Sequence, residues 1–254
     1  MTPISTKQLD LYKKKEPASN NGGPALPLTE HLEELRNKLI FSLITLSAAL
    51  LISFSFSGQV VNLLTHMAPP ETAFLQIKPG EFFFTCMRVS FFAGLLISSP
   101  VIIFQLGSFI FPGLTEKEKK IAIPILTGAP VLFLAGSLFA YFFVAPSMLN
   151  FLFGFGKDII QTSISIEHFV SFTLLIMAIC GSAFLLPIVI FALANVGILN
   201  SEILINKWRY AILTSVISGA VLTPTPDPFN MSIVSGILIA LYFLSWGILR
   251  ITSK

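Results

Sequence analysis

Two short segments of this sequence each carry closely spaced acidic residues whose carboxylates could bind a basic ligand. Glu33 and Glu34 lie in the segment 28–39, and Glu116 and Glu118 lie in a second segment much further along the chain. Carboxylates form strong charge-assisted hydrogen bonds with guanidinium and ammonium groups. Each segment can also be explained as a solvated helix start, where acidic side chains favour the positive end of the helix dipole. If both lie on one side of a membrane, they form two acidic patches on the same face.

The residue patterns typical of enzymes and metal sites are missing from the sequence. The histidines His31, His66 and His168 are isolated, with no HExxH motif and no paired His/Cys spacing. Cys86 and Cys180 lie inside apolar runs, which predicts buried, reduced thiols and no disulfide. There is no glycine-rich phosphate loop and no nucleophile–base couple. We therefore expect no enzymatic activity, no cofactor and no bound metal.

The elements that carry these acids belong to a membrane protein. The chain has 254 residues, of which 54% are apolar and only 11% charged, and its formal net charge is +3. A soluble core of this length cannot absorb so much apolar surface, so the solvent of this chain is a bilayer. The sequence indicates a polar, disordered tail over 1–26 without the apolar core of a cleaved signal peptide, followed by one membrane domain over 27–254.

Leucines mark the entry into this membrane domain. Leu28, Leu32, Leu35 and Leu39 recur at helical spacing, and the charged residues between them face water or lipid headgroups. The segment 28–39 is therefore predicted to be an amphipathic helix that continues into the first membrane span.

Six apolar stretches are candidates for membrane spans. They cover residues 39–56, 82–106, 121–145, 169–196, 210–222 and 233–249. The fifth would be a helix of roughly 20 Å, against a hydrocarbon core of roughly 30 Å. The proline-rich turn 223–228 returns it directly into the sixth span, so we predict a short hairpin tolerated by local bilayer thinning or by burial against longer helices. The alternative is a re-entrant hairpin that never crosses.

The distribution of Lys and Arg predicts the orientation. Of the 16 Lys and Arg residues, all but Lys78, Lys157 and Arg88 fall on the side of the two termini in a six-span arrangement. The positive-inside rule therefore places both termini in the cytoplasm. The fold class predicted is an all-α, polytopic membrane protein of six transmembrane helices, with both termini cytoplasmic and the last two spans forming a short hairpin.

Two features of the spans and their connections are unusual. Arg88 lies one or two turns inside the second span, where it either snorkels to the far interface or lines a wet cavity. Pro187 predicts a kink in the fourth span. The far-side segments 57–81 and 146–168 are too apolar for solvated loops, which predicts short helices at the outer interface.

Four motifs, in this order, resemble those of the TatC family, the multi-spanning component of the twin-arginine protein translocase. The segment His31–Arg36, HLEELR, is similar to the family's entry motif HLxELR, and FIFPGLTEKEK at 109–119 resembles its first cytoplasmic loop. AYFFVAP at 140–146 and TPTPDPF at 223–229 resemble two further family motifs. The resemblance covers residues 28 to 249, and any one motif alone would be weak.

The resemblance implies a receptor for twin-arginine signal peptides of folded cargo, assembled with single-span TatA- and TatB-type membrane proteins and driven by the proton-motive force. It also implies self-association and a multi-pass protein of the cytoplasmic (inner) membrane, with no nucleic acid as partner. In the family, the entry motif and the first cytoplasmic loop form the signal-peptide site. This carries over to Glu34 and Arg36 in the first motif and to Phe109, Pro112 and Glu118 in the second.

Four further residues are expected to make structural or partner contacts: Arg88, Tyr141, Pro187 and Asp227. One departure from the family concerns the fourth span. The family usually has Glu or Gln there, two residues before the proline, in a stretch like F-E-x-P. Here the sequence reads Phe184-Leu185-Leu186-Pro187, so an apolar residue stands at that position. Either apolar packing replaces the polar contact, or a nearby group such as Ser182 does.

Two other functions remain as alternatives. A small-solute transporter or channel would require ionisable residues facing a pathway near the membrane midplane, and Arg88 is the nearest to one. A membrane enzyme would require a nucleophile–base or metal constellation, which the sequence lacks.

Overall fold

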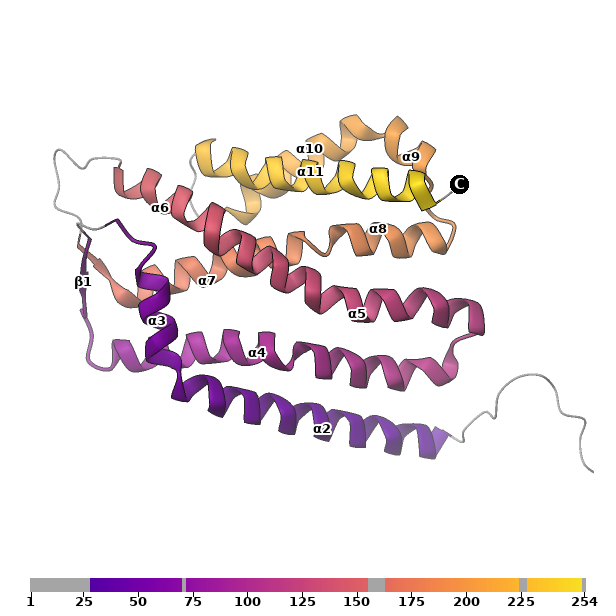
Figure 1. The fold of residues 1–254 in the computed structure, drawn as a ribbon, viewed down its shortest axis with the longest axis horizontal. Helices are drawn as coiled ribbons and strands as arrows, with labels where there is room; N and C mark the ends of the chain where they lie inside the picture. The colour runs from indigo at the N-terminus through magenta and orange to yellow at the C-terminus, as the bar shows by residue number, and fades with distance from the viewer. Residues whose placement is uncertain (1–27, 70–71, 155–162, 224–227, 253–254) are drawn as a thin grey trace, which may run out of the picture. The chain divides into compact units, whose positions relative to one another are not determined.

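The structure is a computed structural model that describes residues 28–69, 72–154, 163–223 and 228–252, and these residues are mostly helical (Figure 1). The tail predicted over 1–26 lies outside the described residues. By its internal contacts the chain divides into a unit of residues 1–37 and a unit of residues 38–254. The first unit is described only over 28–37, the opening turns of helix α2 (Leu28–Ser55).

Two long helices follow the first span. Helix α3 (Ser57–Thr65) leads through strand β1 (Ala73–Leu75) into α4 (Glu81–Ile110). The 3₁₀ turn η1 (Phe111–Gly113) then reverses the chain into α5 (Glu116–Phe139), which runs antiparallel beside α4 (Figure 1).

A π-helical turn interrupts the continuation of α5. The turn η2 (Ala140–Val144) separates α5 from α6 (Ala145–Gly154), and the N–H of Ala145 donates to the carbonyl of Ala140, five residues back. Pro146 follows directly and has no N–H, so it cannot maintain the regular α-helical ladder at this point.

The second half of the chain begins with a broken span. Strand β2 (Ser163–Ser165) leads into α7 (Ile166–Ala183), and α8 (Leu186–Asn195) follows after a break at Phe184 and Leu185. The kink predicted at Pro187 is thus present, because Pro187 occupies the first turn of the new helix. The short helix α9 (Ser201–Asn206), α10 (Trp208–Leu222) and α11 (Pro228–Thr252) complete the fold.

A small parallel sheet ties the two far-side segments together. Ala73 pairs with Ser163 and Leu75 with Ser165. Hydropathy predicted helices in these segments, and α3 and α6 are there, but the two strands were not predicted. Strands of three residues are too short to show the period-two alternation on which a sequence-based prediction depends.

Among the described residues, three clusters of buried side chains join helices of the unit 38–254. One joins η2, α6, α7 and α11 around Met148, Ile176 and Leu238. A second joins α3, α4, α6 and α7 around Phe169, and a third joins α8, α9 and α11. The predicted burial of Cys86 and Cys180 is confirmed, since they are 7% and 1% exposed.

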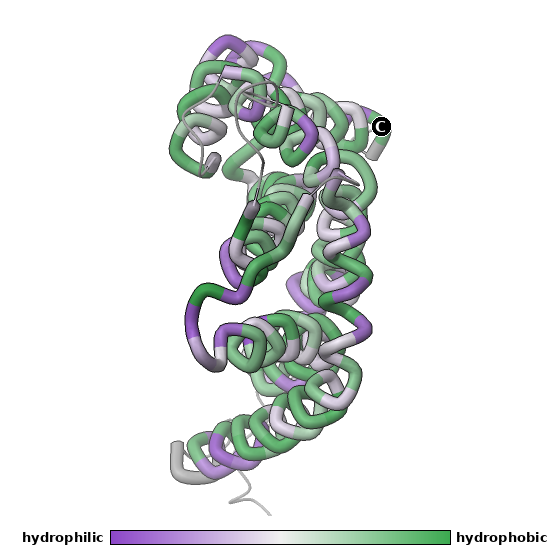
Figure 2. The backbone as a smooth tube through the Cα atoms, turned by 90° about the vertical axis from the view of Figure 1, so that its left-hand side faces the viewer, coloured by the Kyte–Doolittle hydropathy of each residue, from purple (hydrophilic) through white to green (hydrophobic). Residues whose placement is uncertain are grey.

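The outer surface of the helices is apolar. Within the described residues, five helical segments are long and apolar enough to cross a membrane: 31–55, 81–113, 118–154, 166–195 and 228–251. The shorter apolar helix α10 adds a sixth segment. Figure 2 shows apolar residues along most of the helical tube, and side chains such as Leu51 and Val221 are more than 70% exposed. The chain is therefore a polytopic, all-helical membrane protein, as predicted.

Candidate binding site at the α4–α5 turn

The turn between α4 and α5 brings three of the sequence-predicted site residues onto one short segment. Phe109 lies half-buried in the last turn of α4, Pro112 is exposed in η1, and Glu118 is exposed in the first turn of α5. Proline is well placed in η1, because its fixed φ suits the start of a helical turn.

Glu118 is held in place by a capping box. Its Oε2 atom accepts hydrogen bonds from the backbone N–H of Thr115 at 2.7 Å and from the Thr115 hydroxyl at 2.9 Å. In return, Thr115 Oγ1 accepts from the N–H of Glu118 at 3.4 Å. Both backbone donors at the helix start are thereby satisfied. Among the described residues no donor reaches the other oxygen, Oε1, so a fixed carboxylate presents an acceptor to solvent.

The other charges on this turn are partly paired with each other. Glu116 Oε1 accepts from Lys119 Nζ at 2.8 Å, with Glu116 84% exposed. This i,i+3 pair is a surface ion pair of small energetic value. Lys119 is therefore used by Glu116. The carboxylate of Glu118 is instead held by the two Thr115 donors.

Lys38 is a neighbour of this turn that sequence reasoning did not assign to the site. Its Nζ donates to Ser108 Oγ at 2.5 Å, next to Phe109 at the end of α4. In the sequence the two residues are 70 positions apart, so no local pattern could have related them. Lys38 adds a positive charge beside the predicted site, which favours anions and opposes cations at that point.

The entry-motif residues belong to the unit of residues 1–37 and pair locally. Glu34 Oε2 lies 3.9 Å from His31 Nδ1, an interaction that is ionic only when the imidazole is protonated. Arg36 Nη2 lies 3.3 Å from Glu33 Oε1, and both side chains are 65% exposed. Arg36 is thus partnered within its own helix, and Glu34 is 30% exposed.

At the opposite end of α4, Arg88 bridges to α7. Its Nη2 atom lies 2.7 Å from Glu167 Oε1, and its Nη1 atom donates to Ser171 Oγ at 2.5 Å. The side chain remains 52% exposed and lines a cavity of about 600 Å³. Arg88 therefore forms an ion pair with Glu167 on α7, and its side chain also borders the cavity.

Glu81 forms a buried hydrogen-bond centre close by. Its carboxylate accepts from the backbone N–H groups of Ile77 at 2.7 Å and Lys78 at 3.0 Å. It also accepts from the Ser165 hydroxyl and from the N–H of Glu167, so it ties the start of α4 to the end of β2 and the start of α7. No local sequence pattern could relate these partners, because Ser165 is 84 residues away from Glu81.

The remaining predicted contact residues have separate environments. Tyr141 donates its hydroxyl to the carbonyl of Leu63 at 3.3 Å, linking η2 to α3. Pro187 is buried at the start of α8. Asp227 lies outside the described residues.

Leu185, at the position where the family usually has a polar residue, lies in the break between α7 and α8. Phe184, next to Leu185, lies 5.6 Å from the ring of Phe139. The hydroxyl of Ser182 donates to the carbonyl of Ala178 within its own helix. The hydrogen bond of the Ser182 hydroxyl is thus local to α7.

The described residues contain no group of three or more His, Cys, Asp or Glu that could hold a metal ion.

Comparisons with known proteins all indicate one family. Residues 30–236 match the family model described as Sec-independent protein translocase protein (TatC). The chain is 37% identical over 230 residues to the Sec-independent protein translocase protein TatC of Synechocystis, covering 90% of each protein. It is also 40% identical to the tatC-like protein ycf43 of Porphyra purpurea over the same shares. The chloroplastic TATC of Oryza sativa is 34% identical and matches 96% of this chain and 68% of its own length.

A solved structure agrees with these relatives. The crystal structure of a twin-arginine translocase receptor, TatC, in the detergent DDM superposes with a TM-score of 0.72. It is 34% identical to this chain and matches 86% of this chain and 99% of its own.

Proposed function

Because this chain belongs to the TatC family of Sec-independent protein translocase components, we propose that it is the receptor that binds twin-arginine signal peptides of folded cargo. The observation that carries this proposal is the fixed, exposed carboxylate of Glu118. A guanidinium offers a planar fork of donors that matches a carboxylate, and a lysine ammonium does not. A carboxylate that is already oriented by Thr115 loses little side-chain entropy when it binds.

The second arginine requires a second acceptor. We assign it to the entry motif, where Glu34 supplies a partly exposed carboxylate. Arg36 already pairs with Glu33, so its role is to balance the charge of this acidic segment and to favour its orientation in the membrane. Phe109 and Pro112 supply the apolar rim of the site on the α4–α5 turn.

The assembly is proposed to include single-span TatA- and TatB-type proteins and further copies of this chain, with the proton-motive force as the energy source. Helix α10 supports a docking role, because it is short for a membrane span and exposes Leu213, Ile217 and Val221 by 55% or more. Apolar helices of partner proteins pack against such a surface by van der Waals contact.

The protein is a multi-pass membrane protein, and we propose that the α4–α5 turn faces the cytoplasm. The start of α10 and the end of α11 carry Arg209 and Arg250, whose guanidiniums lie 5.7 and 5.4 Å from the ring centroids of Trp208 and Trp246. Trp and Arg together are typical of a membrane interface on the positive side.

The charge of Glu118 can be separated from its capping role by two substitutions. Gln at this position can still form a capping box, so Glu118→Gln removes the charge and keeps the helix start. Thr115→Ala breaks the capping box and keeps the carboxylate. We expect Glu118→Gln to lower crosslinking of a twin-arginine precursor to membranes carrying this chain by about tenfold, the loss of one charged hydrogen bond, and Thr115→Ala to lower it less. Crosslinking that is unchanged by Glu118→Gln would place the arginine site elsewhere.

A further inference from the structure

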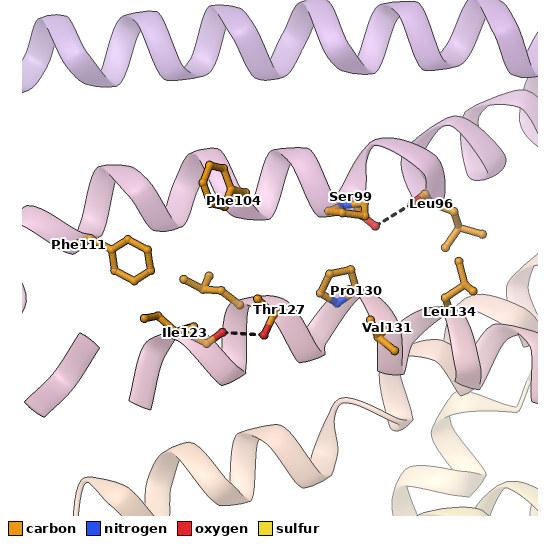
Figure 3. Close-up of a pocket in the computed structure, with 11 residues that line it drawn as sticks. Leu96, Ser99, Phe104, Phe111, Ile123, Thr127, Pro130, Val131 and Leu134 are labelled. Atoms are coloured by element: carbon orange, nitrogen blue, oxygen red, sulfur yellow. Dashed lines mark hydrogen bonds between the residues drawn. The ribbon is translucent and has the colours of Figure 1, made fainter. Parts of the chain in front are cut away.

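An apolar cavity of about 570 Å³ lies between α4 and α5 (Figure 3). Both helices belong to segments that are long and apolar enough to cross a membrane, so the cavity lies in the membrane part of the chain. Its volume falls in the range of roughly 300–1,000 Å³ that is usual for ligand sites. Side chains from both helices and from η1 line it, among them Leu96, Phe104, Phe111, Ile123, Pro130 and Leu134.

The cavity is open toward the surroundings of the two helices. Phe104 and Val131 line it and are 66% and 63% exposed, and Ile123 is 51% exposed. In a membrane-spanning helix, exposed apolar side chains of this kind face lipid. A lipid chain can therefore enter the cavity sideways from the bilayer.

The two hydroxyl groups in the cavity wall are already used. Ser99 Oγ donates to the carbonyl of Leu96 at 2.8 Å, and Thr127 Oγ1 donates to the carbonyl of Ile123 at 2.9 Å (Figure 3). Both bonds lie within the residue's own helix, so neither hydroxyl needs a ligand to satisfy it. The wall is therefore suited to an occupant that brings no polar group into the cavity.

The cavity is about as long as one leaflet of a bilayer is thick. On α5 the lining extends from Ile123 to Leu134, roughly 16 Å along the helix. Half of the hydrocarbon core of a bilayer is roughly 15 Å. At one end the lining includes Phe111, the first residue of η1. The cavity thus extends from the α4–α5 turn over the depth that one acyl chain occupies.

Lys38 of α2 lies at the end of the cavity nearest this turn. Its Nζ atom donates to Ser108 Oγ at 2.5 Å. Ser108 follows Phe104 by four residues and precedes Phe111 by three, so it shares the helix face of these two lining residues. An ammonium carries a full charge and three N–H donors, so the bond to Ser108 leaves Lys38 able to attract an anion.

Two further lysines adjoin the same end of the cavity. Lys119 and Lys120 lie one turn before the first lining residue of α5, on the face that lines the cavity. Lys119 pairs with Glu116 at 2.8 Å, and Lys120 is exposed. Together with Lys38, these ammonium groups outnumber the carboxylates of Glu116 and Glu118. The end of the cavity at the turn therefore favours an anion.

We propose that this cavity binds an anionic phospholipid, with one acyl chain between α4 and α5 and its phosphate at Lys38 and Lys120. Lysine binds phosphate as a point charge, and basic pockets between membrane helices are suited to anionic headgroups. The acyl chain matches the apolar wall, because it buries no polar group. A zwitterionic phospholipid has the same chains and no net charge, so the lysines distinguish the two. The proposal does not depend on signal-peptide binding.

A phosphatidylglycerol with a diazirine on its acyl chain tests the proposal, using the full chain in nanodiscs of unlabelled phosphatidylcholine. Mass spectrometry after irradiation locates the labelled residues. We expect Val131 to be labelled more strongly than Leu138, which is 47% exposed on the same helix and lies outside the lining. A phosphatidylcholine with the same diazirine chain should label Val131 at least about fivefold less, the effect of one lysine on an anionic lipid.

Substitution of single lysines tests the headgroup site. We expect Lys38→Gln and Lys120→Gln each to lower the labelling of Val131 by phosphatidylglycerol by about fivefold. Gln at position 38 can still donate a hydrogen bond to Ser108. Lys207→Gln is the matched control, because it removes the same charge from an exposed position between α9 and α10. It should leave the labelling unchanged.

Two outcomes would overturn the proposal. Equal labelling of Val131 by the two lipids, or an equal loss in the Lys207 variant, would show that acyl chains enter without recognition of the headgroup. Labelling of Val131 no stronger than that of Leu138 would show that lipid does not fill the cavity, which would then be left to an apolar segment of a protein.

A steric variant provides a second readout. Val131→Trp fills part of the cavity, and Leu138→Trp adds the same side chain outside it. We expect the labelling of Phe104 by phosphatidylglycerol to fall severalfold with Val131→Trp and to be unchanged with Leu138→Trp. Equal labelling of Phe104 in the two variants, with both chains incorporated at the same level, would contradict the placement of the acyl chain.

Discussion

At the scale of single residues, the carboxylates of Glu118 and Glu81 have different environments and different roles. Glu118 is exposed, and only its Oε2 atom is held by Thr115. Glu81 is 2% exposed, and its two oxygens accept from four donors. The first arrangement leaves an acceptor for a ligand, whereas the second uses the whole carboxylate to join parts of the fold.

Removing Glu81 should destabilise the protein without a direct effect on cargo binding. Glu81→Ala leaves the buried hydroxyl of Ser165 and the N–H groups of Ile77 and Glu167 without their acceptor, which is costly. We expect the unfolding temperature in detergent to fall by several degrees, and by less for Glu81→Gln, which keeps one acceptor oxygen. Glu202→Ala, at an exposed acid near the start of α9, is the control. Equal unfolding temperatures for the Glu81 and Glu202 variants would contradict this structural role.

At the scale of elements, the pairing of α10 with α11 depends on close approach at one glycine. A Cβ atom at Gly219 would clash with the Ser235 side chain and would lie 3.1 Å from the carbonyl oxygen of Met231. Small residues at such crossings let two membrane helices pack closely. The position of the short helix α10 therefore depends on Gly219.

A large side chain at Gly219 should separate α10 from α11. We expect Gly219→Leu to lower the unfolding temperature and to weaken capture of single-span partner proteins in pull-down from membranes. Gly236→Leu is the matched control, because a Cβ atom at Gly236 meets no heavy atom within 4 Å. If the Gly236 variant were affected as strongly as the Gly219 variant, the loss would come from glycine replacement itself and not from the helix crossing.

The long helices could be predicted from the sequence, whereas the connections between distant segments could not. A bilayer requires continuous apolar stretches, so hydropathy places α4, α7 and α11 near their observed positions. Pro187 likewise predicts the break before α8, since proline cannot continue a helix. Strands β1 and β2 are three residues each, and their pairing joins segments far apart in sequence.

The candidate site was predictable only in part for the same reason. Glu118 and Thr115 are three residues apart, within reach of a local motif such as the capping box. Lys38 and Ser108, or Glu81 and Ser165, meet only in the folded chain. The cavity between α4 and α5 depends on how two helices pack and not on the periodicity of either one.

At the scale of the whole molecule, the topology predicts which side of the membrane each turn faces. Gln76 precedes the start of α4, and Glu116 follows its end as the first residue of α5; both are exposed. Cysteines introduced at these two positions should react with an impermeant maleimide from opposite sides of the membrane. The native Cys86 and Cys180 are buried, so the unsubstituted chain gives the background. Labelling of both positions from the same side would contradict the proposed arrangement of spans.

The receptor function depends on discrimination between arginine and lysine, which have the same charge but different geometry. Affinity of a purified twin-arginine precursor for this chain in lipid nanodiscs, compared with a twin-lysine precursor that is otherwise identical, tests this most directly. The account predicts that the twin-arginine precursor binds at least about tenfold more tightly, because a guanidinium directs donors in a fixed plane at the open Oε1 atom of Glu118 and is more weakly hydrated than an ammonium. Equal affinities for the two precursors would contradict it.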